Sequence, residues 1–99
     1  VMSVSVPGRA IVDAGLKALA FDSGPPLVHA TRGLTYERAS DEHGVLRVAG
    51  GVTPPALGDR IWLIPGHCDP TVNLYDWIVG MRGERVECLW PVAARGALG

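Results

Sequence analysis

The chain has 99 residues and a net charge of −1, with 47% hydrophobic and 19% charged residues, which fits one small globular domain. The basic residues are scattered and no apolar run approaches the ~20 residues that span a bilayer, so neither nucleic acid nor a membrane is an expected partner. Two cysteines are too few for a disulfide framework, which favours a cytoplasmic location.

Short apolar segments separated by turn-forming residues run through the whole chain. The 13 glycines and 8 prolines recur at short intervals, with valine, isoleucine, leucine, tryptophan and threonine between them. This pattern predicts a mostly-β domain, a small β-barrel or sandwich, with one or two short helices. Trp62, Trp77 and Trp90 lie in apolar segments and are expected in the core or at a domain interface. In chain order, we expect strands at residues 2–6, 9–13, 34–39, 45–48, 60–64, 77–81 and 85–90.

Two segments between the first strands carry different signals. The sequence "DAGLKALAF", residues 13–21, contains helix-forming residues, although Gly15 interrupts it and it lasts barely two turns. The sequence "DSGPPL", residues 22–27, is expected to be a loop, because glycine and consecutive prolines disfavour regular structure. His29 follows this loop without a partner nearby in the sequence, so we expect it to be structural.

The second half of the chain predicts one helical turn and one hairpin. The sequence "PTVNLYD", residues 70–76, favours a single turn of helix with Asp69 as its N-cap and Pro70 in the first helical position. The sequence "MRGERVE", residues 81–87, predicts a β-hairpin in which Gly83 occupies the position that needs a permissive backbone.

A histidine, a cysteine and an aspartate stand together in "LIPGHCDP", directly after an expected buried strand. In an extended backbone, His67 and Asp69 would face one side and Cys68 the other. An imidazole nitrogen and a carboxylate oxygen on one face would form half of a divalent-metal site. The alternative is that Asp69 caps the short helix while His67 packs or hydrogen-bonds in the loop. Cys68 and Cys88 are expected to be small buried hydrophobic residues.

The sequence "DEHG", residues 41–44, falls at an expected strand–turn–strand junction. Glu42 and His43 are candidates for a supporting or catalytic role, because histidine is the side chain that most readily exchanges a proton near neutral pH. The alternative is a solvated hairpin tip, since turns collect aspartate and glycine for reasons of backbone geometry alone.

Taken together, the blocks "RAIVDAGLKALAFDSG", "DEHG", "PGHCDPTVNLYD" and "WPVAARG" resemble the C-terminal domain of the D-threonine aldolase and D-serine dehydratase family. These are pyridoxal-phosphate enzymes of the alanine-racemase-like fold (fold type III), and the resemblance spans roughly residues 4–96. It implies that residues 1–99 are the C-terminal β domain of a two-domain enzyme, whose N-terminal TIM-type barrel is absent from this chain and binds the cofactor. A chain that starts at Val1, within an apolar run, is what such a fragment should look like.

Carried onto this sequence, the metal-binding pair of the family is His67 and Asp69, with Glu42 and His43 as possible supporting residues. The dehydratase branch has cysteine as the second ligand, so Asp69 favours the aldolase branch and manganese or magnesium over zinc. The resemblance thus implies an aldolase that converts D-threonine into glycine and acetaldehyde. The alternatives are a D-serine dehydratase that forms pyruvate and ammonia, and a non-catalytic β interaction module.

The resemblance also implies the partners of this domain. They are the barrel domain of the same enzyme, a small D-hydroxy amino acid as substrate, and a second subunit in a homodimer. Lys17, the single lysine, belongs to the "DAGLKAL" block and does not match the lysine that binds the cofactor. We therefore expect the isolated domain to be inactive.

Overall fold

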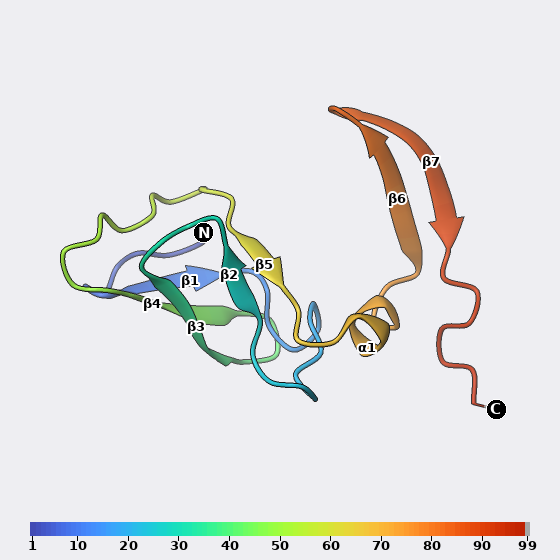
Figure 1. Cartoon of the computed structure of the whole chain (residues 1–99), viewed down its shortest axis with the longest axis horizontal. Helices are drawn as coiled ribbons and strands as arrows, with labels where there is room; N and C mark the ends of the chain where they lie inside the picture. The colour runs from blue at the N-terminus through green and yellow to red at the C-terminus, as the bar shows by residue number, and fades with distance from the viewer. Residues whose placement is uncertain (99) are drawn as a thin grey trace.

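The computed structural model describes residues 1–98, which fold into seven short strands and one helix (Figure 1). The elements are, in chain order, β1 (Arg9–Val12), β2 (Leu27–His29), β3 (Leu34–Ala39), β4 (Gly44–Val48), β5 (Trp62–Ile64), α1 (Cys68–Val72), β6 (Trp77–Arg82) and β7 (Arg85–Pro91). The mostly-β prediction is confirmed. The strands of this described part form three antiparallel sheets and do not close into a barrel.

The core lies on one face of the three-stranded sheet, in which β4 is central between β1 and β3. Its buried side chains fall at every second position of each strand, because strand side chains alternate between the two faces of a sheet. Leu46 of β4 is fully buried at the centre of this cluster. Around it pack Ala10 and Val12 of β1, and Leu34 and Tyr36 of β3.

A second sheet of two strands, β2 and β5, covers part of this core. Val28 of β2 pairs with Leu63 of β5, and both side chains pack against the buried cluster. The expected loop over residues 22–27 therefore ends one residue earlier than predicted, since Leu27 already pairs with Ile64. A strand of three residues is too short to show a recognisable alternation in the sequence, so its conformation depends on pairing with the partner strand.

One prediction near the start of the chain is wrong. Residues 2–6 form no strand, and only Ser3 makes an isolated bridge, to Ile11. Residues 13–21, whose helix-forming residues are interrupted by Gly15, form turns and bends. Gly15 packs so tightly on the turn between β3 and β4 that a Cβ there would lie 2.5 Å from the amide nitrogen of His43.

The hairpin of β6 and β7 stands apart from the other strands, as Figure 1 shows at the orange and red end of the chain. Its turn at Gly83 has φ of 59°, which confirms the predicted hairpin. Among the described helices and strands, β6 and β7 contact only each other. The single helix of residues 1–98, α1, is far too short to cross a membrane.

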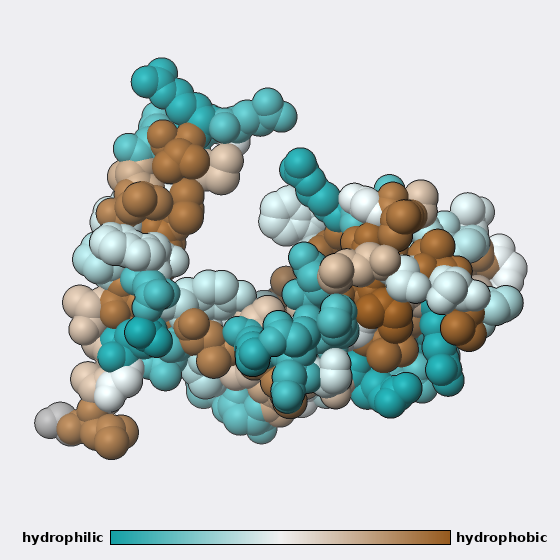
Figure 2. All heavy atoms as spheres, turned by 180° about the vertical axis from the view of Figure 1, so that it is seen from behind, coloured by the Kyte–Doolittle hydropathy of each residue, from teal (hydrophilic) through white to brown (hydrophobic). Residues whose placement is uncertain are grey.

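Several residues expected to be buried are exposed. Trp62, Trp77 and Trp90 are 70%, 55% and 53% exposed, so they are not part of a core within residues 1–98. Cys68 is exposed as well, and Cys88 is half-buried. Figure 2 shows apolar side chains at the surface of the hairpin, with hydrophilic ones at its tip. The sequence pattern correctly marked apolar strands, but strands in a two-stranded hairpin have no second layer to cover them.

Candidate metal centre

The sequence "GHCDP" changes from extended to helical backbone at Cys68. His67 precedes α1 in an extended conformation, with φ of −147° and ψ of 127°, and its side chain makes no capping hydrogen bond. Asp69 is the second residue of the helix, so the predicted N-cap role of Asp69 is wrong by two residues. Pro70 is still tolerated, because the N–H groups of the first turn have no acceptor within the helix. The extended backbone on which His67 and Asp69 were expected to face one side therefore ends at His67.

His67 is held by an aspartate from a distant part of the chain. Its Nδ1 lies 2.8 Å from Oδ2 of Asp22, and both side chains are about half exposed, 47% and 50%. The hydrogen bond to the ionised carboxylate raises the pKa of the His67 imidazole, and the charge of Asp69 adds a smaller effect in the same direction. The same hydrogen bond lowers the pKa of Asp22. Nδ1–H therefore donates to Asp22, and Nε2 is left for another partner.

Asp22 reaches His67 because the segment before it lies along α1. Three residues of this segment, each two apart in the sequence, contact residues that are four apart in and beside α1. The contacts are the Tyr75 hydroxyl donating to the Ala18 carbonyl at 2.8 Å, the Ala20 amide donating to Thr71 Oγ1 at 3.1 Å, and the His67–Asp22 pair. The segment with the interrupted helix signal is thus the support of α1.

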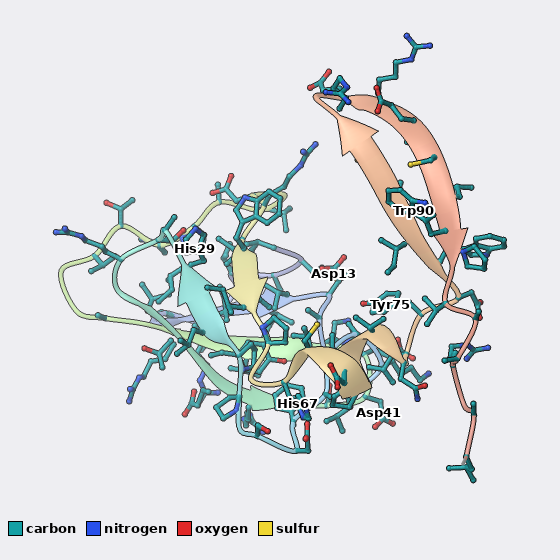
Figure 3. The ribbon with its side chains drawn as sticks, turned by 45° about the vertical axis from the view of Figure 1, so that its right-hand side comes forward. Asp13, His29, Asp41, His67, Tyr75 and Trp90 are labelled. Atoms are coloured by element: carbon teal, nitrogen blue, oxygen red, sulfur yellow. The ribbon has the colours of Figure 1, made fainter. Side chains whose placement is uncertain are left out.

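The core fixes this supporting segment in turn. The Tyr36 hydroxyl donates to the carbonyl of Ala14 at 2.5 Å, and the ring of Phe21 packs against Tyr36 with centroids 5.6 Å apart. Both ends of the segment therefore rest on the same buried tyrosine. Figure 3 shows His67 beside the start of α1, whereas Trp90 belongs to the separate hairpin.

Gly66 allows the chain before His67 to approach the loop after Asp22. A Cβ at this position would lie 3.0 Å from the carbonyl oxygen of Ser23 and 3.1 Å from that of Gly24. Such contacts are tighter than a side chain normally tolerates, so a larger residue would push the two loops apart. The glycine of "PGHCD" is therefore needed for the close approach that brings His67 to Asp22.

Glu42 and His43 lie at the exposed turn between β3 and β4, as the hairpin-tip alternative predicts. Glu42 forms an ion pair with Lys17, which lowers the pKa of the Glu42 carboxyl and raises that of the Lys17 ammonium group. The His43 amide donates to Ser40 Oγ at 3.3 Å. Within residues 1–98, neither side chain hydrogen-bonds to His67 or Asp69.

His67 and Asp69 supply an imidazole nitrogen and a carboxylate oxygen at the protein surface. Among residues 1–98, no group of three or more histidine, cysteine, aspartate or glutamate side chains is arranged to enclose a metal ion. The Asp69 carboxylate is exposed and lines a shallow pocket of about 300 Å³ together with Asn73 and Arg95. This donor set fits an ion whose other ligands come from water, a substrate or another part of a protein.

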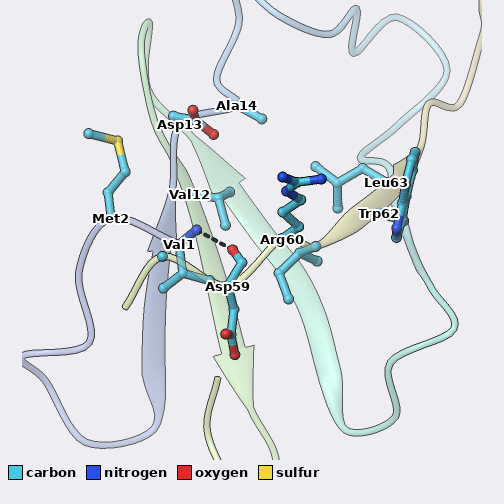
Figure 4. A pocket seen from close by; sticks show the side chains of 11 residues that line it. Val1, Met2, Val12, Asp13, Ala14, Asp59, Arg60, Trp62 and Leu63 are labelled. Atoms are coloured by element: carbon cyan, nitrogen blue, oxygen red, sulfur yellow. Dashed lines mark hydrogen bonds between the residues drawn. The ribbon is translucent and has the colours of Figure 1, made fainter. Parts of the chain in front are cut away.

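A larger cavity of the described chain lies elsewhere. It has a volume of about 460 Å³ and opens beside β1 and β5, where Asp13, Arg60 and Trp62 line it (Figure 4). None of the predicted site residues borders it. Its size alone assigns it no chemistry, and the geometry around His67 remains the stronger candidate.

Known proteins are similar to this chain in sequence. The family described as "Putative serine dehydratase domain" matches residues 1–81. This chain belongs to that family. Its sequence is 51% identical over 96 residues to 3-hydroxy-D-aspartate aldolase from Paracoccus denitrificans (strain Pd 1222), and 48% identical over 96 residues to D-threonine aldolase from Arthrobacter sp.. Both alignments cover 97% of this chain.

A solved structure shows the same fold. The crystal structure of D-threonine aldolase from Filomicrobium marinum superposes with a TM-score of 0.86 at 45% identity and covers 99% of this chain. The chain spans about a quarter of each relative: 24% of the Paracoccus protein, 25% of the Arthrobacter protein and 27% of the Filomicrobium chain. The resemblance stated from the sequence blocks is confirmed at the level of the family.

Sequence analysis missed Asp22. It lies 45 residues from His67, and an aspartate followed by serine and glycine reads as an ordinary turn residue. The only signal was indirect: "DAGLKALAFDSG" and "PGHCDPTVNLYD" were both blocks of the family resemblance, and these are the two segments that pack together.

Proposed function

We propose that this chain is the C-terminal β domain of a larger pyridoxal-phosphate-dependent aldolase that acts on D-3-hydroxy amino acids, with His67 and Asp69 as ligands of a divalent metal ion. The observation that carries the proposal is the hydrogen bond between Nδ1 of His67 and Asp22, which leaves Nε2 without a hydrogen bond within residues 1–98. The charge of Asp69 also acts on this imidazole. The names of the relatives, aldolases of D-threonine and of 3-hydroxy-D-aspartate, support the substrate class.

The ligand types favour manganese or magnesium over zinc. A carboxylate oxygen and one imidazole nitrogen suit a hard or borderline ion that also retains water ligands, whereas thiolate ligands favour zinc. When bound, such an ion supplies Lewis acidity that lowers the pKa of a coordinated substrate hydroxyl. His67 and Asp69 would hold the ion at the surface of the domain, where a substrate presented by another domain can reach it.

Pyridoxal phosphate does not fit this chain. Lys17 is the single lysine, and its ammonium group is exposed and paired with Glu42. We therefore assign the cofactor, which stabilises carbanions as an electron sink, to the N-terminal barrel of the parent enzyme. Glu42 and His43 would contribute only indirectly, since the turn they form holds the start of the segment that carries Asp22.

The exposed hairpin supports a role inside a larger protein. Seven large hydrophobic side chains of β6 and β7 are between 48% and 57% exposed, and an isolated two-stranded hairpin is marginally stable in water. A contiguous apolar surface of this kind favours contact with another domain or subunit. We assign this surface to the barrel domain of the parent enzyme and to the homodimer that the enzyme would form.

One observation favours the dehydratase as a second candidate. Cys68 is exposed beside His67 instead of buried, so a thiol is available at the same site. A site in which Cys68 replaced Asp69 as the second ligand would favour zinc and elimination from D-serine. The two candidates therefore differ in which neighbouring side chain holds the ion.

The test uses the complete parent enzyme with manganese, magnesium or zinc restored after chelation. The proposal expects metal-dependent release of glycine from D-threonine, lost in both His67→Ala and Asp69→Ala and retained in Cys68→Ala. Pyruvate release from D-serine that depends on Cys68 and zinc would instead establish the dehydratase. Full activity of all three variants would leave "GHCD" as a turn, and the domain as an interaction module.

A further inference from the structure

The hydrogen bond between Asp22 and His67 has a consequence for the metal centre beyond the two ligands. We propose that Asp22 is the positioning residue of this centre: it fixes the ring of His67 and its tautomer so that Nε2 is the metal-binding nitrogen. The inference rests on the proposed function, because it assumes that His67 binds a metal ion.

The chemistry of the imidazole makes this role specific. A neutral imidazole carries one proton, and the ionised Asp22 carboxylate 2.8 Å from Nδ1 holds that proton on Nδ1. The lone pair is then on Nε2, the nitrogen that points away from Asp22. A carboxylate that accepts from the second ring nitrogen also raises the basicity of the first, and such partners commonly change metal affinity by about 10–100-fold.

The surrounding structure shows that the contact is built into the fold. Asp22 ends a segment that hydrogen-bonds to Thr71 of α1 and to Tyr75 just after it, so its backbone cannot easily shift along the helix. Gly66 removes the side chain that would separate the two loops. The side chain of His67 is half exposed, and its one side-chain hydrogen bond within residues 1–98 is to the Asp22 carboxylate.

The experiment measures Mn²⁺ affinity of the cofactor-loaded full-length enzyme by electron paramagnetic resonance, which counts free Mn²⁺ without any turnover. Asp22→Ala should weaken binding about 10–100-fold. Asp22→Asn should weaken it less, because the amide oxygen still accepts from Nδ1. The matched control is Asp13→Asn, which removes the same charge from an exposed carboxylate outside the site and should leave the affinity unchanged. Equal melting temperatures of the variants would exclude a general loss of structure.

The possible results separate this inference from the proposed function. If His67→Ala loses Mn²⁺ while Asp22→Ala binds as wild type does, Asp22 has no positioning role and the metal site stands. If Asp22→Asn loses as much as His67→Ala, Asp22 is a ligand itself, which also overturns the positioning role. If neither His67→Ala nor Asp69→Ala changes the affinity, the proposed metal site fails, and the role of Asp22 fails with it.

Discussion

The three-stranded sheet and the β6–β7 hairpin use similar residues with opposite results. In the sheet, alternate residues of β1, β3 and β4 meet in one buried cluster around Leu46. In the hairpin, no side chain is buried, although leucine and valine occur there as well, together with tryptophan and methionine. Strand-forming sequence is therefore not sufficient for a core, since a strand face becomes buried only when a second layer covers it.

The sheet and the hairpin also differ in their relation to the candidate site. The sheet anchors the supporting segment through Tyr36, and through it the position of Asp22 and His67. The hairpin contacts no other helix or strand of the described chain and carries none of the proposed ligands. The three-stranded sheet thus positions the candidate site, and the exposed β6–β7 hairpin is available to bind a partner.

The first prediction compares the same substitution in the two regions. Leu46→Ala removes a fully buried side chain and should lower the free energy of unfolding by about 2–5 kcal/mol, the usual range for leucine in a core. Leu89→Ala removes a side chain that is 55% exposed and should change the stability of this 99-residue chain by less than about 1 kcal/mol. Urea unfolding of the two variants measures both values.

The same pair tests the partner assigned to the hairpin. In the full-length enzyme, the effect of Leu89→Ala should grow toward that of Leu46→Ala if another domain or subunit covers the hairpin. If Leu89→Ala destabilises the short chain as much as Leu46→Ala does, the hairpin already packs against another part of this chain. That result would contradict the difference between the two regions.

The second prediction uses one glycine from each region. A Cβ on Gly44 would lie 2.5 Å from Cε2 and 2.6 Å from Cζ of Tyr36, so Gly44→Ala should destabilise the chain by about 1–3 kcal/mol through overpacking. Gly83 has φ of 59° and no atom within 4 Å of a Cβ, so Gly83→Ala should cost about 1 kcal/mol of backbone strain.

Asparagine separates these two causes, because it tolerates the left-handed conformation but is larger than alanine. Gly83→Asn should recover most of the stability lost in Gly83→Ala, whereas Gly44→Asn should be worse than Gly44→Ala. Thermal unfolding of the four variants provides the ranking. Recovery by asparagine at position 44 would mean that backbone conformation, not contact with Tyr36, limits that site.

The fold was predictable from sequence where the pattern is local. Strand β3 matches its predicted bounds, and β4, β6 and β7 differ by one residue, because alternation and turn glycines act within a few positions. The segment over residues 13–21 was not predictable in this way. Its helix-forming residues follow local propensity, but its hydrogen bonds go to distant partners, at Ser40 and Asp41 on one side and Thr71 and Tyr75 on the other.

The residues of the candidate site also differ in whether the sequence alone could indicate them. His67 and Asp69 could be found because they are neighbours in the sequence and unusual for this chain. Asp22 could not, since the contact depends on the packing of two segments that are 45 residues apart. Local patterns thus indicate the proposed ligands, while the residue proposed to orient one of them depends on tertiary structure.

The third prediction concerns the tyrosine that joins the core to the site. Tyr36 is 3% exposed, its hydroxyl donates to the Ala14 carbonyl, and burial raises the pKa of its phenol above the ordinary value of 10.0. Above about pH 10 the unfolded chain loses the phenol proton before the folded chain does. The folded state then binds more protons, so the free energy of unfolding should fall as the pH rises through this range.

Tyr36→Phe should cost about 1 kcal/mol at neutral pH, because it leaves the Ala14 carbonyl without its donor, and should remove this alkaline loss. Chemical unfolding at pH 8 and at higher pH values measures both effects. Tyr75→Phe, which retains Tyr36, is the control and should keep the alkaline loss. An alkaline loss in Tyr36→Phe equal to that of wild type would place its origin in other groups, and Tyr36 would then be a packing residue alone.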